Sequence, residues 1–367
     1  MRICYDYQIF AAQRYGGITR YFVEIASRIS QFPGTDLRIL APLYRSKLLQ
    51  EKRNVLPVVG TYFSGAFTRA SGLCMGVGSI YSKASSRWYR PDIVHETYYS
   101  PTKTVSSATK CVITVHDMVA EQFPDPPSRP PGIFPARKAA FERADHLICV
   151  SQNTRADLIR LYGVDTAKVS VIPLGSSIVP STSPPLPIEE PFFLYVGSRW
   201  GYKNFSGLMD AFHQSNLHKS HKIICFGGDG FTDRELQRLH DLDLPLDRFE
   251  IIDGNDDLLS RYYASAVALV YPSLYEGFGI PLVEAMECSC PVLCGKSSSL
   301  PEVAGDAASY FDASDPSSIA EAMVKIANSP DGRQLLIRKG KDRVRQFSWD
   351  KCSQQTYAVY EKLLSDR

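Results

Sequence analysis

Short apolar runs rich in β-branched residues alternate with segments of helical period along the whole chain. This alternation is typical of repeated βαβ units, which build parallel sheets. In the first half it predicts strands over residues 2–7, 36–43, 92–98, 111–116, 146–150 and 170–174. In the second half it predicts strands over residues 192–197, 222–227, 250–253, 267–272, 292–294 and 309–311. The pattern therefore predicts an α/β protein with two doubly wound parallel sheets.

A proline-rich stretch without any period separates the two sets of strands. Its composition is that of a linker, and 367 residues are enough for about two domains. The sequence thus predicts a Rossmann-like domain over 1–175, a linker over 176–190 and a second Rossmann-like domain over 191–346. A helical pattern over 347–367 follows, free to pack on either domain. Ligands of open α/β sheets bind at the carboxyl ends of the strands, so we expect the site there.

Charge is distributed unevenly between the two halves. Residues 1–175 hold 22 Lys and Arg against 13 Asp and Glu, and the remaining residues hold 19 against 26. The first half is thus suited to an anionic partner such as a membrane surface, a phosphorylated lipid or a nucleic acid. No recognition motif supports a nucleic acid, so we expect none as a partner.

The nine cysteines lie mostly in apolar runs without CxxC spacing, which predicts reduced thiols in a cytosolic protein. The first residues lack a signal peptide, and no apolar run is long enough to span a bilayer.

The segment 64–90 stands apart from the repeats. It is rich in Gly and Ser and interleaves aromatic residues such as Phe67 and Trp88 with cations such as Arg69 and Arg87. Two readings remain open. An amphipathic basic helix of this kind can lie in a membrane interface. Alternatively, the helix packs its aromatic residues on the first sheet and leaves its arginines in solvent.

The most informative motif follows the strand predicted over 267–272. Two glutamates, Glu276 and Glu284, enclose a Gly-Phe-Gly turn, and Pro281 stands at the start of a helix. The amides at this helix start favour a phosphate, and Glu284 on the first turn is suited to ribose hydroxyls. The other candidate binding residues of the motif are Gly277, Phe278, Gly279, Ile280 and Leu282.

A second motif opens the second domain. The strand over 192–197 leads into Ser198, and the cations Arg199 and Lys203 follow, four residues apart. Cations at a helix start oppose the helix dipole, so we expect an anion between them. A diphosphate satisfies this expectation, because Arg binds two oxygens at once and Lys binds a third.

The first half offers weaker signals. Gly16 and Gly17 precede an amphipathic helix and allow the backbone to approach a phosphate or sugar. His116 ends an apolar strand at the edge where ligands bind, and His95 ends another. Each histidine is either a hydrogen-bonding partner of a substrate hydroxyl or a satisfied structural group.

In this order, the motifs resemble a retaining GT-B glycosyltransferase of the family 4 type, a kind found in bacterial polysaccharide assembly. The resemblance covers nearly the whole chain. It rests on Gly16-Gly17, His116-Asp117, Arg199 with Lys203, the Gly227–Gly230 run, the Glu276 to Glu284 motif and Leu300–Gly305. It implies two Rossmann-like domains facing across a cleft, with the C-terminal helix crossing back to the N-terminal domain.

The resemblance also implies roles for the candidate residues. Glu276 would contact the donor sugar and Glu284 its ribose. Arg199, Lys203 and the amides after Phe278 would hold the diphosphate. His116 would face the sugar, and Gly17 would close on the donor. The loop 253–257, with Asn255, would lie near the base.

The chemistry implied is hexosyl transfer with retention, without a metal or other cofactor. Asp241 and Asp243 have the spacing of a metal-binding DxD motif but lie in a polar segment after a helix, not at the end of a buried strand. The donor is expected to be a UDP-hexose, with GDP-mannose as the alternative.

The acceptor is expected to be a lipid-linked, anionic oligosaccharide in capsule, exopolysaccharide or O-antigen assembly. That would place the protein in the cytoplasm, at the inner face of the membrane, with peripheral contact to anionic lipid. Two alternatives share the architecture: a non-hydrolysing UDP-N-acetylglucosamine 2-epimerase-like enzyme, and a non-catalytic GT-B partner subunit that binds sugar nucleotides.

Overall fold

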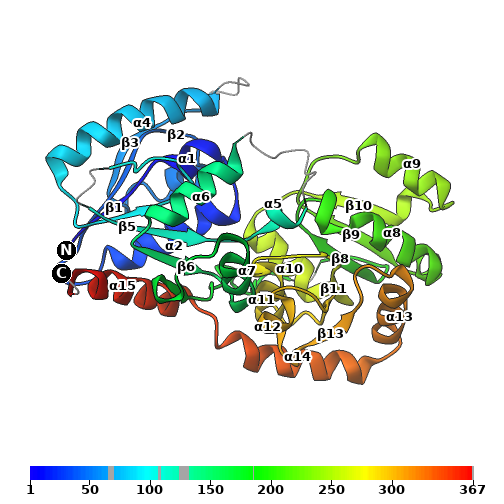
Figure 1. The fold of residues 1–367 in the computed structure, drawn as a ribbon. Coiled ribbons are helices and arrows are strands. Elements are labelled where there is room, and N and C mark those ends of the chain that lie inside the picture. Colours follow the sequence, from blue (N-terminus) through cyan, green and yellow to red (C-terminus); the bar gives the residue numbers. More distant parts are fainter. Residues whose placement is uncertain (65–69, 106–108, 124–131, 185, 366–367) are drawn as a thin grey trace. The chain divides into compact units, whose positions relative to one another are not determined.

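The structure is a computed structural model that describes residues 1–64, 70–105, 109–123, 132–184 and 186–365. It divides into two compact units (Figure 1). The first comprises Met1–Glu121, Pro127–Leu174 and Trp349–Arg367, and the second comprises Gln122–Pro126 and Gly175–Ser348. Each unit is built around one parallel sheet, as the alternating pattern predicts.

The described residues of the first unit form a seven-stranded parallel sheet in the order β3-β2-β1-β4-β5-β6-β7. Its strands are β1 (Arg2–Tyr5), β2 (Asp36–Tyr44), β3 (Val58–Tyr62), β4 (Ile93–Glu96), β5 (Lys110–Val115), β6 (His146–Cys149) and β7 (Val169–Val171). Six of these match the strands expected from the sequence. The edge strand β3 was missed, because Gly60 interrupts a run of only five residues.

Helices connect and cover these strands. They are α1 (Gln8–Ala12), α2 (Gly17–Ile29), α3 (Lys47–Glu51), α4 (Ala70–Tyr89), α5 (Val119–Gln122), α6 (Ile133–Arg143), α7 (Gln152–Tyr162) and the 3-10 turn η1 (Thr166–Lys168). Polar residues set several of their starts. At α7, for example, Ser151 Oγ accepts a hydrogen bond from the amide of Thr154 at 3.0 Å.

The second unit repeats the scheme with a six-stranded parallel sheet, again among the described residues, in the order β10-β9-β8-β11-β12-β13. Its strands are β8 (Phe192–Val196), β9 (Lys222–Phe226), β10 (Phe249–Ile252), β11 (Ala268–Tyr271), β12 (Val292–Gly295) and β13 (Ala308–Phe311). All six lie where the apolar runs predict them.

The helical elements of this unit are η2 (Gly201–Lys203), α8 (Phe205–Gln214), η3 (Leu217–Lys219), α9 (Asp233–Asp241), η4 (Leu246–Arg248), α10 (Asp256–Ser265), α11 (Ile280–Glu287), α12 (Leu300–Ala304), α13 (Pro316–Ala327) and α14 (Pro330–Val344). Aromatic residues such as Phe193, Phe212 and Phe249 fill the core between sheet and helices.

The last helix, α15 (Trp349–Ser365), belongs to the first unit although it follows the second in the chain (Figure 1). It packs beside α2, and its Tyr360 is fully buried. The hydroxyl of Tyr360 lies 2.6 Å from His95 Nδ1 and 3.2 Å from the hydroxyl of Tyr5. The helix therefore completes the core of the first unit.

The proline-rich stretch 176–190 is docked rather than loose where the structure describes it. The amide of Ser181 donates to Ser260 Oγ at 3.1 Å, and Arg261 Nε donates to the carbonyl of Pro184 at 3.1 Å. This stretch therefore lies against α10.

The nine cysteines are all buried and form no disulfide. None of the helices in the described ranges is both long and apolar enough to cross a membrane.

Candidate functional site

The candidate site of the second unit lies at the carboxyl ends of the neighbouring strands β8 and β11. The amide of Leu274 donates to the carbonyl of Tyr202 at 2.8 Å and ties the two loops together. Lys203 Nζ then lies 2.6 Å from Glu276 Oε1 and 3.1 Å from the hydroxyl of Tyr271. Two residues from separate motifs are thus brought into direct contact.

This ion pair is largely withdrawn from water, with the side chains of Lys203 and Glu276 15% and 10% exposed. Burial alone would lower the pKa of Lys203, but the attraction of the Glu276 carboxylate outweighs it and keeps that pKa above its ordinary value. Lys203 is therefore a permanent cation at this edge of the sheet.

Three consecutive serines after β12 hold the loop that carries Glu276. Ser297 Oγ donates to the carbonyl of Leu274 at 2.8 Å, and Ser298 Oγ accepts from the amide of Glu276 at 2.9 Å. The hydroxyl of Ser299 is buried and lies 2.9 Å from the carbonyl of Glu276 and 3.0 Å from that of Phe278. The sequence analysis missed these positioning residues. The Ser-Ser-Ser run directly after a predicted strand was the available signal.

The turn into α11 depends on Gly279, whose φ of 95° lies in the left-handed region. A Cβ at this position would also approach Leu300 Cδ2 to 2.8 Å. The amides of Gly279, Ile280 and Leu282 were expected to be free for a phosphate, but that of Leu282 donates to the carbonyl of Gly279 at 3.0 Å. Pro281 follows Ile280 in the first turn, as the motif predicts, and Gly277 and the buried Phe278 lie in the loop before it.

Glu284 was expected on the first turn of the helix, but α11 begins at Ile280 and Glu284 lies in its second turn, where it is half-buried. Its Oε2 accepts a hydrogen bond of 3.1 Å from the hydroxyl of the fully buried Tyr263. This contact orients the carboxylate from the side of α10.

Arg199 does not share a partner with Lys203. Its Nε lies 2.9 Å from Glu235 Oε1 on α9, and its Nη2 donates to the carbonyls of Asp229 and Gly230 at 2.6 and 3.0 Å. Each cation therefore already has a carboxylate of the protein as its partner, which the spacing of the motif did not indicate. Glu235 and Glu276 follow them by 36 and 73 residues, a separation that local reasoning does not bridge.

One donor of Arg199 is nevertheless unused. Its Nη1 is buried and has no hydrogen-bond partner among the described residues. A buried guanidinium N–H without an acceptor is unfavourable, so this atom is suited to an anionic oxygen brought by a ligand.

Two further expected contacts already have structural roles. The carbonyl of Ser198 accepts a hydrogen bond from the hydroxyl of Tyr195 at 2.6 Å. Asn255 is the N-cap of α10, where its Oδ1 accepts from the amide of Leu258 at 2.9 Å. The Asn255 cap fixes the loop 253–257 that was expected near the base.

His116 lies at the end of β5 in the first unit. Its ring packs edge-on against Tyr21 of α2 with centroids 5.1 Å apart, and burial lowers its pKa to about 4. Its Nε2 is buried without a hydrogen-bond partner in the described ranges. A neutral imidazole with an unused ring nitrogen fits a substrate hydroxyl better than a structural role.

The next residue, Asp117, is held in place. Its Oδ1 accepts from the amide of Val119 at 3.1 Å and from Arg137 Nη2 at 3.3 Å. Arg137 also lies 2.6 Å from Glu121 Oε2, and both side chains of that pair are buried. These contacts fix the turn that carries His116. Gly16 caps the helix α2, which begins at Gly17.

His95 is a structural group. It is fully buried, and its Nε2 lies 2.8 Å from Thr114 Oγ1 on the side opposite Tyr360. Burial lowers its pKa to about 3, so it stays neutral. The structural reading of this histidine is therefore the correct one.

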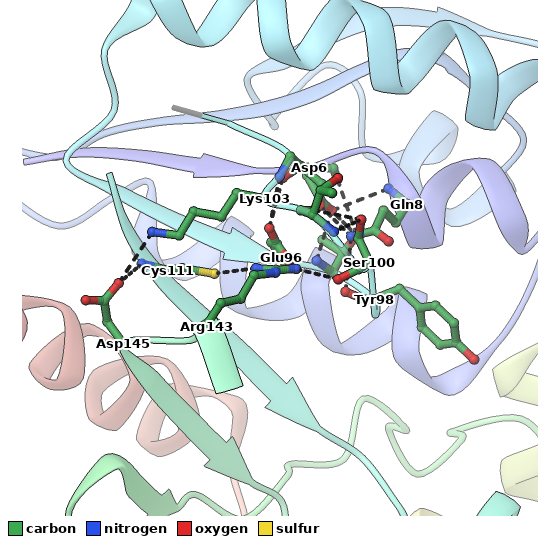
Figure 2. A network of polar contacts seen from close by, with 12 residues as sticks. Asp6, Gln8, Glu96, Tyr98, Ser100, Lys103, Cys111, Arg143 and Asp145 are labelled. Carbon is green, nitrogen blue, oxygen red and sulfur yellow. Dashed lines mark hydrogen bonds and ion pairs between the residues drawn. The ribbon is translucent and has the colours of Figure 1, made fainter. Parts of the chain in front are cut away.

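Two buried carboxylates near His95 were missed by the sequence analysis. Asp6 and Glu96 follow or end the adjacent strands β1 and β4 (Figure 2). Asp6 Oδ1 accepts from the amide of Thr97 at 2.9 Å, and Glu96 Oε2 pairs with Arg143 at 2.5 Å. Burial raises the pKa of Glu96 to about 7. Through Arg143 the network connects the loop after β4 to α6. No local sequence pattern predicts it.

No group of three or more His, Cys, Asp or Glu in the described part of the chain is arranged to hold a metal ion. The second unit offers two cations, two acidic side chains of the Glu276 to Glu284 motif and amides at a helix start, and the first unit by itself offers a neutral histidine.

Comparison with known families identifies both halves of the chain. Residues 181–343 match the glycosyl transferases group 1, and residues 15–177 match glycosyltransferase family 4. The chain belongs to the family 4 glycosyltransferases of GT-B fold.

Individual relatives agree with this assignment. O-antigen chain mannosyltransferase B of Escherichia coli is 28% identical over 81% of this chain and 82% of its own. The O-antigen chain mannosyltransferase RfbU of Salmonella typhimurium is 29% identical over 66% of this chain and 67% of its own. The crystal structure of Anabaena HepE in complex with UDP and glucose covers 99% of this chain and 100% of its own, with a TM-score of 0.76 and 16% identity.

Proposed function

We propose that this glycosyltransferase moves a hexose from a nucleoside diphosphate sugar to a saccharide acceptor in the assembly of a cell-surface polysaccharide. The single observation that carries the proposal is the arrangement around Lys203. The permanent cation Lys203 and the unused guanidinium donor of Arg199 lie on the loop after β8. The amide-bearing start of α11 follows the loop after the neighbouring strand β11. A diphosphate supplies the negative charge that this set of donors can stabilise.

The chemistry of the leaving group explains why these groups matter. When the bond between sugar and phosphate breaks, negative charge grows on the diphosphate, and the anomeric carbon becomes electron-poor. Preplaced cations and amides stabilise that growing charge, and losing one such donor typically lowers the rate by about 10²–10³. Lys203 and Arg199 are the proposed donors to the diphosphate, and Glu276 is the proposed contact to the sugar.

The remaining candidates complete the proposed donor site. Glu284 would bind the ribose hydroxyls, held in orientation by Tyr263. His116 would offer its unused Nε2 to a sugar hydroxyl, and its low pKa means that it binds as a neutral group. Gly17 would bring the backbone of the first unit to the donor.

The donor is proposed to be GDP-mannose, with a UDP-hexose as the alternative to be tested beside it. The sequence motifs alone favoured the UDP-hexose, and the support for mannose comes from the names of two relatives, both O-antigen mannosyltransferases. The same names support a polysaccharide acceptor, which we propose to be lipid-linked.

Thermal shift with GDP, UDP and ADP and their sugar derivatives tests the proposal directly. A nucleotide present at 100 times its Kd stabilises the folded state by about 2.7 kcal/mol, so the correct base should stand out. The variants K203M and R199M should lose most of this shift. If none of the nucleotides raises the melting temperature of the wild type, the proposed donor site is wrong.

Retention of configuration is the finer part of the proposal. We expect the product anomer to have the same configuration as the donor, which proton NMR of the first turnover products measures. An inverted anomer would contradict retention. Formation of an epimerised sugar nucleotide without acceptor would instead favour the epimerase-like alternative, and donor binding without any turnover would favour a partner subunit.

A further inference from the structure

Helix α4 packs against β2 and α1 of the first unit (Figure 1). Small residues of the helix face inward. Cys74 and Ser82 are fully buried, and Gly78 is also buried. The helix comes so close that a Cβ on Gly78 would lie 2.2 Å from the ring of Tyr7. Around Gly78, the side of the helix that faces the protein therefore has no room for large side chains.

The large apolar side chains of α4 point away from the protein instead. Leu73, Ile80 and Trp88 are 46%, 76% and 82% exposed. They are spaced by seven and eight residues, which is close to two helical turns, so they form one stripe. Single exposed apolar residues are ordinary, but a continuous stripe marks an interaction surface. The expectation that this helix packs its aromatic residues on the sheet holds for Tyr89 and is wrong for Trp88. Phe67 and Arg69 of the same expectation lie outside the described residues.

The charge around the stripe has one sign. Between Glu51 and Asp92 the chain contains six Lys and Arg and not one Asp or Glu. Of these cations, Lys83, Arg87 and Arg90 are exposed on α4 or directly after it. An apolar stripe bordered only by cations is complementary to a surface that is apolar inside and anionic outside.

We propose that the exposed stripe of α4, made of Leu73, Ile80 and Trp88 with Lys83 and Arg87 beside it, docks the protein on a bilayer that contains anionic phospholipids. The apolar side chains enter the boundary between headgroups and acyl chains, and the indole of Trp88 lies at headgroup level. The cations pair with lipid phosphates. From Leu73 to Trp88 the stripe is straight and about 22 Å long, which suits a flat surface.

This inference deepens the proposed function, because a lipid-linked acceptor is presented at such a surface. Its failure is distinguishable from failure of the donor site. Nucleotide binding is measured by thermal shift without lipid, and vesicle binding is measured without nucleotide. No residue of the α4 stripe belongs to the candidate donor site.

Co-sedimentation with vesicles tests the proposal on the full chain. The wild type should sediment with vesicles of phosphatidylcholine and phosphatidylglycerol at low salt, and much less with phosphatidylcholine alone. The variant R87Q should bind about fivefold more weakly, since each basic residue near the surface contributes about that factor. The double variant I80S/W88S should bind about tenfold or more weakly, because two large side chains no longer leave water. All variants should keep the thermal shift given by the nucleotide.

The matched control is L246S. Leu246 is 52% exposed on η4 of the second unit, so the change removes an exposed leucine outside α4 and should leave vesicle binding unchanged. Trp88 fluorescence in a W200F background should shift to the blue on binding, because Trp349 is buried throughout.

Two results would overturn the proposal. One is vesicle binding by I80S/W88S that equals the wild type. The other is a wild type that ignores vesicles but forms a dimer by light scattering, which I80S/W88S converts to a monomer. In that case a second copy of the chain covers the stripe.

Discussion

Removing the charge of Glu276 tests the electrostatics of the site most sharply. The Lys203 ammonium lies 2.6 Å from Glu276 Oε1, and after E276Q it keeps its hydrogen bond to the hydroxyl of Tyr271. Breaking a fully buried pair costs about 3–5 kcal/mol, because the remaining ion stays out of water. Both side chains keep some exposure, so we expect a smaller loss of roughly 2–3 kcal/mol in the free energy of unfolding.

Denaturant unfolding and thermal melts measure this loss. For a unit of this size each kcal/mol lowers the melting temperature by about 2–4 °C, which gives a decrease of roughly 4–12 °C for E276Q. K203M should show a comparable loss because it leaves the Glu276 carboxylate alone. The double variant K203M/E276Q removes both charges and should recover part of the loss, with a coupling of about 2 kcal/mol.

Nucleotide binding separates the two single variants. A nucleoside diphosphate supplies Lys203 with a new anion, so it should restore stability in E276Q but not in K203M. The control is K296M, which breaks an exposed pair with Asp312 and should change stability by less than about 1 kcal/mol. Strictly additive losses in the double variant, or equal rescue of both single variants by nucleotide, would refute the reasoning.

Four further predictions follow from other parts of the structure. Burial lowers the pKa of His95 from 6.5 to about 3. Below about pH 6.5 the unfolded chain therefore binds a proton at this histidine that the folded chain does not bind, and stability should fall as the pH drops. Glu96, with its pKa raised from 4.5 to about 7, opposes this trend, so the test is a shallower acid dependence of urea unfolding in H95Q than in the wild type. The variant S299A should lose about 1–2 kcal/mol and bind nucleotide several-fold more weakly by calorimetry, because two carbonyls of the Glu276 loop lose their shared donor. G279A should lower both nucleotide affinity and melting temperature, since alanine is strained at a φ of 95° and its Cβ would approach Leu300; an unchanged affinity would contradict the role given to this turn. EDTA should leave the transferase activity intact, and a loss that manganese restores would contradict a metal-independent reaction.

The strands could be predicted because each is a short apolar run that both faces of a parallel sheet bury. The failure at β3 has the same cause, since an edge strand with Gly60 inside it carries a weaker pattern. The motif containing Glu276 and Glu284 could be recognised because glycines, a proline and acidic residues stand close together in the chain.

The parts of the site that the sequence did not reveal depend on distant residues. The pairing of Arg199 with Glu235 and the serine contacts to the Glu276 loop arise only when separate strands meet at one edge. For helix α4 the sequence left two readings open. Tyr89 packs on the sheet and Trp88 does not, and the close approach at Gly78 that leaves space only for small side chains there depends on a distant residue, Tyr7.

The place of α15 in the first unit constrains how the molecule is made. Tyr5, Tyr21 and His95 are synthesised early, yet they gain contacts with Tyr360 and Trp349 only after the whole second unit has left the ribosome. Until then the nascent first unit exposes an apolar face that a chaperone would have to shield. Ribosomes that stop before Trp349 would therefore release a chain prone to aggregation, even though both sheets are complete in sequence.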